Sequence, residues 1–530
     1  MRQDVLKTYK DVHSWVGIIA GMFLFIAFWA GALTMFKEPL IRWATPPAAS
    51  FSAPTPIEQT DELIARTVAA YPKAAKGYTV VLAPGPDSPS RLYWNEGGRR
   101  DPKLVGANLS SDGKLEVAPI ETSRIGYLVD ELHRRVGLPL PNSIAMPITT
   151  IVALLYFVAI ISGVICLLPS LTKDLFALRV SHNLKRMWLD LHNVLGFFSL
   201  PFHIVIALTT VVFAFHDQIY DVQDKLIYQD NIEARWEDHE HPPSPDPSTP
   251  LLPVPELLAR LKLQAPGFRP VEMNFHREAP DHGGHMALTI TGHDDRYGHR
   301  SATVGYGAVD ATTGKLVETD LMPGFQPPLN ATLSGFFTLH FGSFGGLPVR
   351  WGYFLMGLVG TIIFYTGNLV WIESRRKRER RGSGPVTQSR QTFVLAALTV
   401  GVCLGAIAGT GFSIAAAKWL PGRVDNVENW HVGIYYAVFL GSAGWAFARG
   451  AARGSGELLA FAALALAAIP LSTLFAPGAW SHADMSLLVD WMAAGGALAL
   501  LYVAHLSRQR SRQGQKDSVW LSTAVDGQTL

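Results

Sequence analysis

Residues 11–17 read DVHSWVG and residues 190–196 read DLHNVLG. In both stretches an aspartate stands two positions before a histidine and a glycine stands four positions after it, at the start of a long apolar segment. A second pair of matching stretches follows, because Leu-His precedes Gly-Leu-Pro at 132–139 and again at 339–348. The chain therefore contains an internal duplication in which an apolar segment, a polar module, a Leu-His motif and another apolar segment occur twice.

The composition indicates a protein that has lipid as part of its solvent. Only 17% of the 530 residues are charged and the net charge is +2, whereas soluble domains carry about 25% charged residues. A nearly neutral chain does not favour nucleic-acid binding, which needs a basic face. The two cysteines, Cys166 and Cys403, lie in apolar runs, which argues against a disulfide scaffold, an iron–sulfur cluster or a cysteine-type zinc site.

Eight segments are long and apolar enough to cross a bilayer, which takes about 20 helical residues. The first of them is too long for a signal peptide and is interpreted as a membrane anchor. Pro201 is expected to kink the third segment. The eight predicted spans cover residues 14–36, 145–168, 190–215, 351–372, 392–417, 430–448, 457–478 and 486–506.

The positions of lysine and arginine predict the orientation of these spans. With eight spans, five basic groups fall on one face of the membrane, which the positive-inside rule assigns to the cytoplasm. Both termini are therefore predicted to be cytoplasmic. The five groups lie near residues 2–10, 173–186, 375–381, 449–453 and 508–516.

Two polar insertions are predicted on the opposite, periplasmic face. Each begins with a proline-rich stretch and continues with an amphipathic helix and strand-like segments, as in IEQTDELIARTVAAYP followed by YTVVLA, or VPELLARLKLQAPG followed by PVEMNF. The predicted fold class is thus an α-helical polytopic membrane protein with two small α+β modules. The predicted divisions are 1–36, 37–143 (module 1), 144–215, 216–349 (module 2), 350–382, a four-helix extension 392–506, and a tail 507–530.

Four histidines occupy the duplicated positions. His13 and His192 stand at the cytoplasmic ends of two spans, and His133 and His340 at the outer ends of two others. Two imidazoles on neighbouring helices can supply both axial ligands of a haem, so the duplication predicts two such pairs. His203 lies 11 residues after His192, about 16 Å along a straight helix and on nearly the same face, and is the alternative ligand.

Other features leave alternatives open. A histidine-rich stretch from His276 to His299 is interpreted as loop polarity or as a metal or substrate contact. Dinucleotide-binding and phosphate-loop patterns are absent from the sequence. Electrons, if the protein transfers them, would then come from quinol or from a separate cytosolic reductase.

Taken together, DVHSWVG, ELHRRVGLP, WLDLHNVLG and TLHFGSFGGLPV resemble the PepSY-associated transmembrane family over about residues 5–380. The resemblance implies an inner-membrane protein of bacteria with two PepSY-like periplasmic modules and haem b bound by the four histidines. It also implies a reductase that acts on ferric siderophores or other ferric chelates in the periplasm. The last four spans are additional to the shorter members and have no assigned role.

Three functions follow as hypotheses. The first is transmembrane electron transfer through a cytoplasmic-side haem and an outer haem to a ferric chelate. The second is a permease for siderophore, haem or metal, although few ionisable residues lie within the spans. The third is a membrane regulator of the PepSY type, which would leave the duplicated histidines without a role.

Overall fold

The computed structural model divides the chain into two compact units, one helical and one built on a sheet. The helical unit comprises Met1–Pro46, Thr122–Ala214 and Arg350–Leu530, and the sheet unit comprises Pro47–Glu121 and Phe215–Val349. The structure describes residues 2–46, 51, 53–84, 88–98, 103–170, 183–215, 218, 221–222, 224–229, 249–278, 284–377, 379, 386–477, 484–513 and 517–521.

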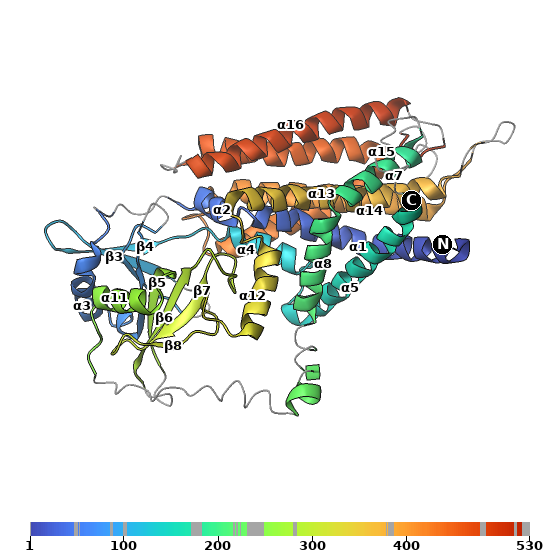
Figure 1. Ribbon diagram of the computed structural model, residues 1–530. Coiled ribbons are helices and arrows are strands. Elements are labelled where there is room, and N and C mark those ends of the chain that lie inside the picture. Colours follow the sequence, from blue (N-terminus) through green and yellow to red (C-terminus); the bar gives the residue numbers. More distant parts are fainter. Residues whose placement is uncertain are drawn as a thin grey trace. The chain divides into compact units, whose positions relative to one another are not determined.

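The helical unit is a bundle of long apolar helices (Figure 1). Within the described residues, six helices are long and apolar enough to cross a membrane, or seven when the bent pair α7–α8 is counted as one span. The protein is thus a multi-pass membrane protein. Its helices are α1 (Gln3–Thr34), α2 (Lys37–Ala44), α4 (Ile125–Arg134), α5 (Asn142–Leu167), α7 (Leu184–Phe198), α8 (Leu200–Ala214), α13 (Gly346–Arg375), α14 (Arg390–Ala416), α15 (Val427–Phe475) and α16 (Asp484–Gln513).

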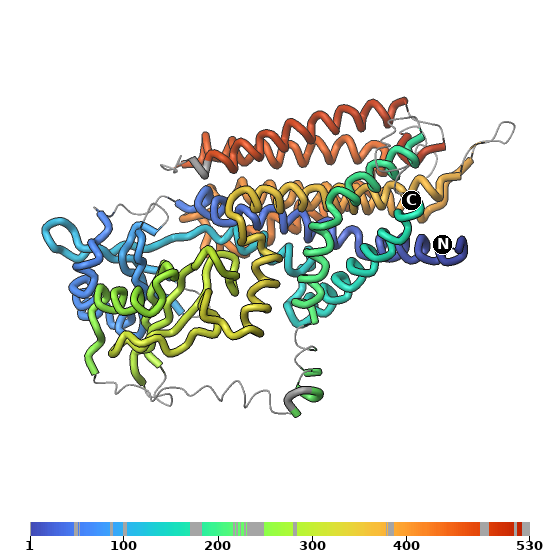
Figure 2. The backbone as a smooth tube through the Cα atoms, viewed as in Figure 1, coloured from blue at the N-terminus to red at the C-terminus, as the bar shows by residue number. Residues whose placement is uncertain are grey.

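The expected kink in the third span is present and large. α7 and α8 meet at an angle of 70°, a turn that can be followed in the tube drawing (Figure 2). Pro201 lies in the first turn of α8, where its missing N–H is tolerated, but its ring could not continue the preceding helix. The prediction of a kink at this proline is confirmed.

The sixth and seventh expected spans fall on α15, where residues 430–448 and 457–475 lie on two helices that join at Gly450. Gly450 interrupts this element with φ 70° and ψ 158°, a conformation that glycine adopts far more readily than other residues. The two segments on either side of Gly450 both pack on α14. Added Cβ atoms would lie 2.7 Å from Ala443 at Gly401, 2.9 Å from Tyr435 at Gly409 and 3.0 Å from Ala465 at Gly411, which is the close approach that small residues permit.

The sheet unit contains one antiparallel sheet of eight strands in the order β4-β3-β2-β1-β5-β6-β7-β8. Its first four strands come from the first insertion and its last four from the second. The strands are β1 (Gly77–Val81), β2 (Leu92–Asn95), β3 (Leu104–Leu109), β4 (Leu115–Ile120), β5 (Arg269–Arg277), β6 (Met286–His293), β7 (Gly305–Val309) and β8 (Leu316–Glu318), with helices α3 (Thr60–Ala70), α11 (Val254–Gln264) and α12 (Pro328–Phe341).

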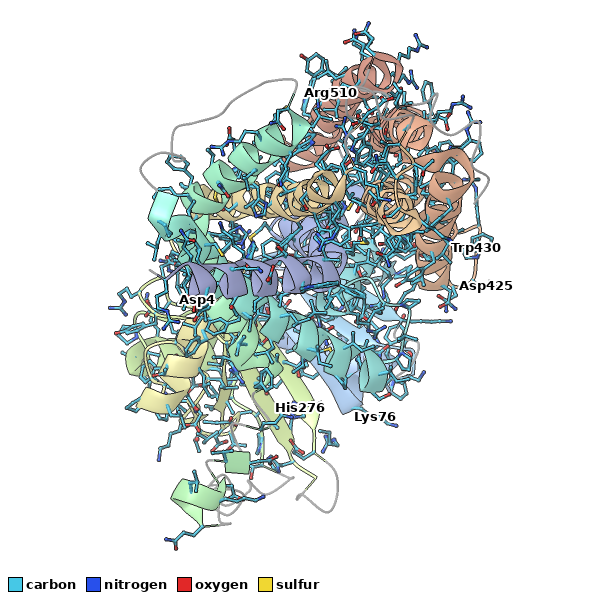
Figure 3. The ribbon with its side chains drawn as sticks, turned by 90° about the vertical axis from the view of Figure 1, so that its right-hand side faces the viewer. Asp4, Lys76, His276, Asp425, Trp430 and Arg510 are labelled. Atoms are coloured by element: carbon cyan, nitrogen blue, oxygen red, sulfur yellow. The ribbon has the colours of Figure 1, made fainter. Side chains whose placement is uncertain are left out.

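The two insertions are joined through β1 and β5, a pairing that the sequence did not predict. Tyr78 stands opposite Phe275, and their rings stack with centroids 4.9 Å apart. Figure 3 labels Lys76 and His276 at the neighbouring ends of these strands. One hydrophobic core, which includes Leu63 of α3 and Leu257 of α11, extends across both halves of the sheet.

The boundaries of the first insertion also differ from the expected range 37–143. α2 and α4 lie with the helical unit because they bury Trp43, Leu128 and Leu132 in its core. In the sequence, the four strands of this insertion therefore lie between α2 and α4, which both belong to the helical unit.

Candidate functional site

His13 of α1 and His192 of α7 lie close together within the helical unit. Their ring centroids are 6.2 Å apart and the ring planes are inclined by 68°. Both side chains are half-buried. The structure thus brings together the pair that the duplication predicted for the cytoplasmic ends of the spans.

Each of these rings is held by a backbone carbonyl of a neighbouring helix. His13 Nδ1 donates to the carbonyl oxygen of Ala159 at 2.9 Å, and His192 Nδ1 donates to that of Ile363 at 3.1 Å. A carbonyl only accepts, so the proton of each neutral ring resides on Nδ1 and Nε2 keeps its lone pair. This is the tautomer in which histidine binds a metal through Nε2, and a backbone carbonyl is a usual partner for the other nitrogen.

The surroundings of the two rings repeat residue by residue. Ser162 stands three positions after Ala159, and its hydroxyl lies 3.4 Å from His13 Nδ1. Thr366 stands three positions after Ile363, and its hydroxyl lies 3.3 Å from His192 Nδ1. Both hydroxyls also donate to the same carbonyls that the histidines use.

A glycine follows each of these hydroxyl residues and provides room for the ring. A Cβ added at Gly163 would lie 2.9 Å from His13 Cε1, and a Cβ at Gly367 would lie 3.4 Å from His192 Cε1. The first distance is shorter than real Cβ contacts, so the ring could not stay in place beside a larger residue. The missing side chains therefore allow each imidazole to reach the helix backbone.

His133 of α4 repeats the same arrangement on α1. Its Nδ1 donates to the carbonyl oxygen of Ala27 at 2.8 Å. Gly31 stands four positions after Ala27, and an added Cβ there would lie 2.8 Å from His133 Nδ1. Ala27 is 14 residues beyond His13 on α1, which corresponds to about 21 Å along the helix.

The core of the bundle around Phe28 is aromatic. The ring of Phe28 contacts Tyr156, His203 and Phe364, with centroid distances of 5.5, 5.5 and 5.0 Å. His203 is 5% exposed, and its Nδ1 lies 2.6 Å from the Tyr156 hydroxyl. Its Nε2 is buried without a hydrogen-bond partner among the described residues.

The remaining predicted ligand, His340, lies near the end of α12 in the sheet unit, where its ring meets the edge of Phe341 at 5.8 Å. His133 belongs to the helical unit. The pairing of His133 with His340 therefore stays a prediction.

The histidine-rich stretch shows no common centre in the part of it that the structure describes. His276 Nε2 lies 3.0 Å from Glu278 Oε1, and His282 lies outside the described residues. No group of three or more His, Cys, Asp or Glu side chains in the described ranges has the arrangement of a metal site.

The donor set fits a haem iron at the first pair. Two imidazoles that bind one metal from opposite sides have centroids about 6 Å apart, since each metal–nitrogen bond is about 2 Å long. The separation of His13 and His192 matches this value. Their protonated Nδ1 atoms leave both Nε2 atoms available, and the glycines give the rings space beside the helices.

The supporting residues Ser162, Gly163, Thr366 and Gly367 were not identified from the sequence. The available signal was a hydroxyl residue followed by glycine at 162–163 and at 366–367, one in each duplicated return span. Glycine is common in membrane helices for packing reasons alone, so this signal became specific only beside the rings.

A family model described as "PepSY-associated TM region" matches residues 11–374. No curated protein in the comparison matches the chain.

Proposed function

The chain belongs to the PepSY-associated TM family, and from this premise we propose that it is an electron-transfer protein that holds haem b between paired histidines. His13 and His192 would bind one haem, and His133 and His340 a second. The electrons would reduce a ferric siderophore or another ferric chelate. Reduction weakens the chelate because hard oxygen ligands prefer Fe³⁺ to Fe²⁺.

The observation that carries this proposal is the histidine, carbonyl and glycine arrangement, which occurs three times. A histidine that merely lined an interface would not need a hydrogen bond from Nδ1 to a carbonyl of a neighbouring helix. Nor would it need a glycine four residues after the residue that supplies this carbonyl. Three of the four duplicated histidines have both. This arrangement fixes the tautomer and orients Nε2, which is what an axial ligand requires.

The protein would hold the haem, orient its histidine ligands and keep water away from the site. The carbonyls of Ala159, Ile363 and Ala27 fix the three rings, and the buried aromatic side chains around Phe28 exclude water from the bundle core. When bound, haem supplies one-electron transfer, with a potential that axial ligation and burial adjust. The electron donor would be quinol or a cytosolic reductase.

The location proposed for the protein is the bacterial inner membrane, with eight crossings and both termini in the cytoplasm. The break at Gly450 supports two crossings within α15, because the segments on either side, 427–449 and 451–475, are each long enough to span a bilayer. A reporter enzyme that is active only in the periplasm should be active when it is fused near residue 270. A reporter that is active only in the cytoplasm should be active when it is fused near residue 380. The reverse pattern would contradict the orientation and the direction of electron flow.

The haem content of the purified protein tests the proposal directly. A pyridine haemochrome assay should give about two haems b per chain, and the reduced protein should show the α band of six-coordinate haem. A protein purified from haem-sufficient cells without any haem would contradict the proposal and would favour the regulatory or permease hypothesis.

A further inference from the structure

Arg300 has no acidic partner among the described residues, whereas the other charges of its loop are paired. Arg296 donates to both carboxylate oxygens of Asp294, at 2.9 and 2.7 Å, and Arg269 donates to Asp295 at 2.5 Å. Arg300 Nη1 is buried without a hydrogen-bond partner among the described residues. Its guanidinium lies over the ring of Phe337 on α12, 4.1 Å from the centroid, which is a cation–π contact.

The neighbouring His299 is likewise buried with unused polar atoms. Its side chain is 6% exposed, and neither ring nitrogen has a partner at hydrogen-bond distance and angle within the described part of the chain, although the backbone of Asp294 interacts with the ring. Buried polar groups of native proteins are nearly always satisfied, so these two adjacent side chains are candidates to bind a polar group. The two residues together offer a charged planar donor and an imidazole N–H.

The loop that carries these residues is pressed against α12. The main-chain N–H of His299 donates to Thr338 Oγ1 at 3.0 Å. A Cβ added at Gly298 would lie 2.8 Å from the same oxygen, so only glycine permits this approach. The backbone of the loop is therefore held in place independently of the unused side-chain atoms.

The chemistry of the two side chains selects a carboxylate. Arginine presents a rigid fork of N–H groups that matches the two oxygens of a carboxylate, and stacking on an aromatic ring orients this fork. A single cationic side chain balances the single charge of a carboxylate. Phe337 precedes His340 by three residues, so the two are neighbours on the surface of α12.

We propose that Arg300 and His299 form a carboxylate-binding site on α12 beside His340. The carboxylate has two possible sources, a propionate of the haem held by His340 or a carboxylate of the ferric chelate. The first source rests on the proposed function, whereas the second requires only that the protein binds a ferric carboxylate.

The haem source is tested with full-length protein purified without haem and titrated with haem or haem dimethyl ester, whose propionates are blocked. Wild type should bind the free acid about tenfold or more tightly than the ester at the outer site, because hydrogen bonds to charged groups are the strong ones. Arg300→Gln should bind both forms equally. Arg300→Lys, which keeps the charge without the fork, should fall between them.

The chelate source is tested by calorimetric titration of the haem-loaded protein with ferric citrate, and with a ferric hydroxamate that has no free carboxylate. If the chelate supplies the carboxylate, Arg300→Gln should weaken only the binding of ferric citrate. The matched control is Arg269→Gln, which removes an exposed arginine paired with Asp295 from the same surface. It should behave as wild type in both titrations.

The outcomes separate this inference from the haem proposal. Loss of the preference for free haem assigns the site to a propionate, and loss of ferric citrate binding assigns it to the chelate. A folded Arg300→Gln protein, monodisperse in detergent, that behaves as wild type in both titrations would overturn the site. If wild type binds no haem, the proposed function fails, and the ferric citrate titration alone then decides whether the carboxylate site exists.

Discussion

The backbone of Gly163 lies against the imidazole of His13, so that an added Cβ would stand 2.9 Å from the ring atom Cε1. Gly31 stands in the same relation to His133, at 2.8 Å from Nδ1. Gly367 lies farther from its histidine, at 3.4 Å from Cε1 of His192. The three glycines therefore form a graded series in which one methyl group tests how closely each ring must approach its carbonyl.

Alanine substitutions in this series should weaken haem binding in the order of these distances. Gly163→Ala and Gly31→Ala should lower haem affinity by about tenfold to a hundredfold, the usual cost of disturbing a ligand's supporting contacts. Gly367→Ala should change it less, because 3.4 Å is close to an ordinary contact. Haem retention during purification and titration of the apoprotein measure the effect.

The matched control for the series is Gly441→Ala on α15, a helix without any of the duplicated histidines, where an added Cβ would meet nothing within 4 Å. This variant should retain wild-type haem affinity. Equal behaviour of Gly163→Ala and Gly441→Ala would mean that the position of His13 beside α5 has no bearing on haem.

The histidine variants test the pairing of ligands. His13→Ala and His192→Ala should each remove the same haem and leave the other spectrum intact, which halves the haem content to about one per chain. His133→Ala and His340→Ala should define the second haem. All four should abolish most ferric-chelate reduction, since a relay of two haems fails when either is lost.

His203→Ala is the discriminating member of this set. His203 Nδ1 lies 2.6 Å from the Tyr156 hydroxyl, so we expect Tyr156 to hold this ring beside the haems. Loss of His203 should then keep both haems and at most shift the reduction potential of one. Its buried Nε2 has no hydrogen-bond partner among the described residues, which keeps it the alternative ligand. Loss of a haem in His203→Ala, with retention in His133→Ala or His340→Ala, would show that the predicted outer pair is wrong.

The shared sheet makes a prediction about stability. Phe275 of β5 is 2% exposed and stacks on Tyr78 of β1, so Phe275→Ala should cost about 3–5 kcal/mol of unfolding free energy. Because one core crosses both halves, amide exchange should accelerate in β2 and β3 as well as in β6 and β7. Leu263→Ala, at a side chain that is 84% exposed, is the control and should change little. Acceleration confined to β5–β8 would show that the two insertions unfold independently.

The sequence predicted the helices of the bundle and the proximity of His13 and His192 for a clear physical reason. Long apolar segments admit few structures in lipid, and a duplicated His at a helix end marks itself by repetition. His13 and His192 could thus be matched before any contact was known. The bend at Pro201 was predictable for a similarly local reason, because proline cannot continue the preceding helix.

Features that depend on distant contacts were not predictable. The pairing of β1 with β5 joins strands from two separate insertions, and nothing in either strand alone specifies the partner. Gly163 and Gly367 resemble other glycines of membrane helices until the rings of His13 and His192 are placed beside them. The separation of the sixth and seventh spans was predicted from hydropathy, but the left-handed conformation of Gly450 that joins them was not.

The last prediction concerns pH and the sheet unit. Burial, with a smaller effect of His293, lowers the pKa of His299 below its usual 6.5, although Asp295 and the backbone and charge of Asp294 oppose the shift. Below about pH 6.5 the unfolded chain therefore binds a proton at His299 that the folded unit does not bind, so the free energy of unfolding falls as the pH falls, by at most about 1.4 kcal/mol per pH unit. The acidic groups act at lower pH: burial raises the pKa of Glu272 above 4.5, and the pKa of Asp294 lies below 3.8. Amide exchange of β7 in the full-length protein, corrected for intrinsic rates, should thus be faster at pH 5.5 than at pH 7.5. His299→Phe should remove this difference, whereas an unchanged difference in that variant would assign the pH dependence to another group.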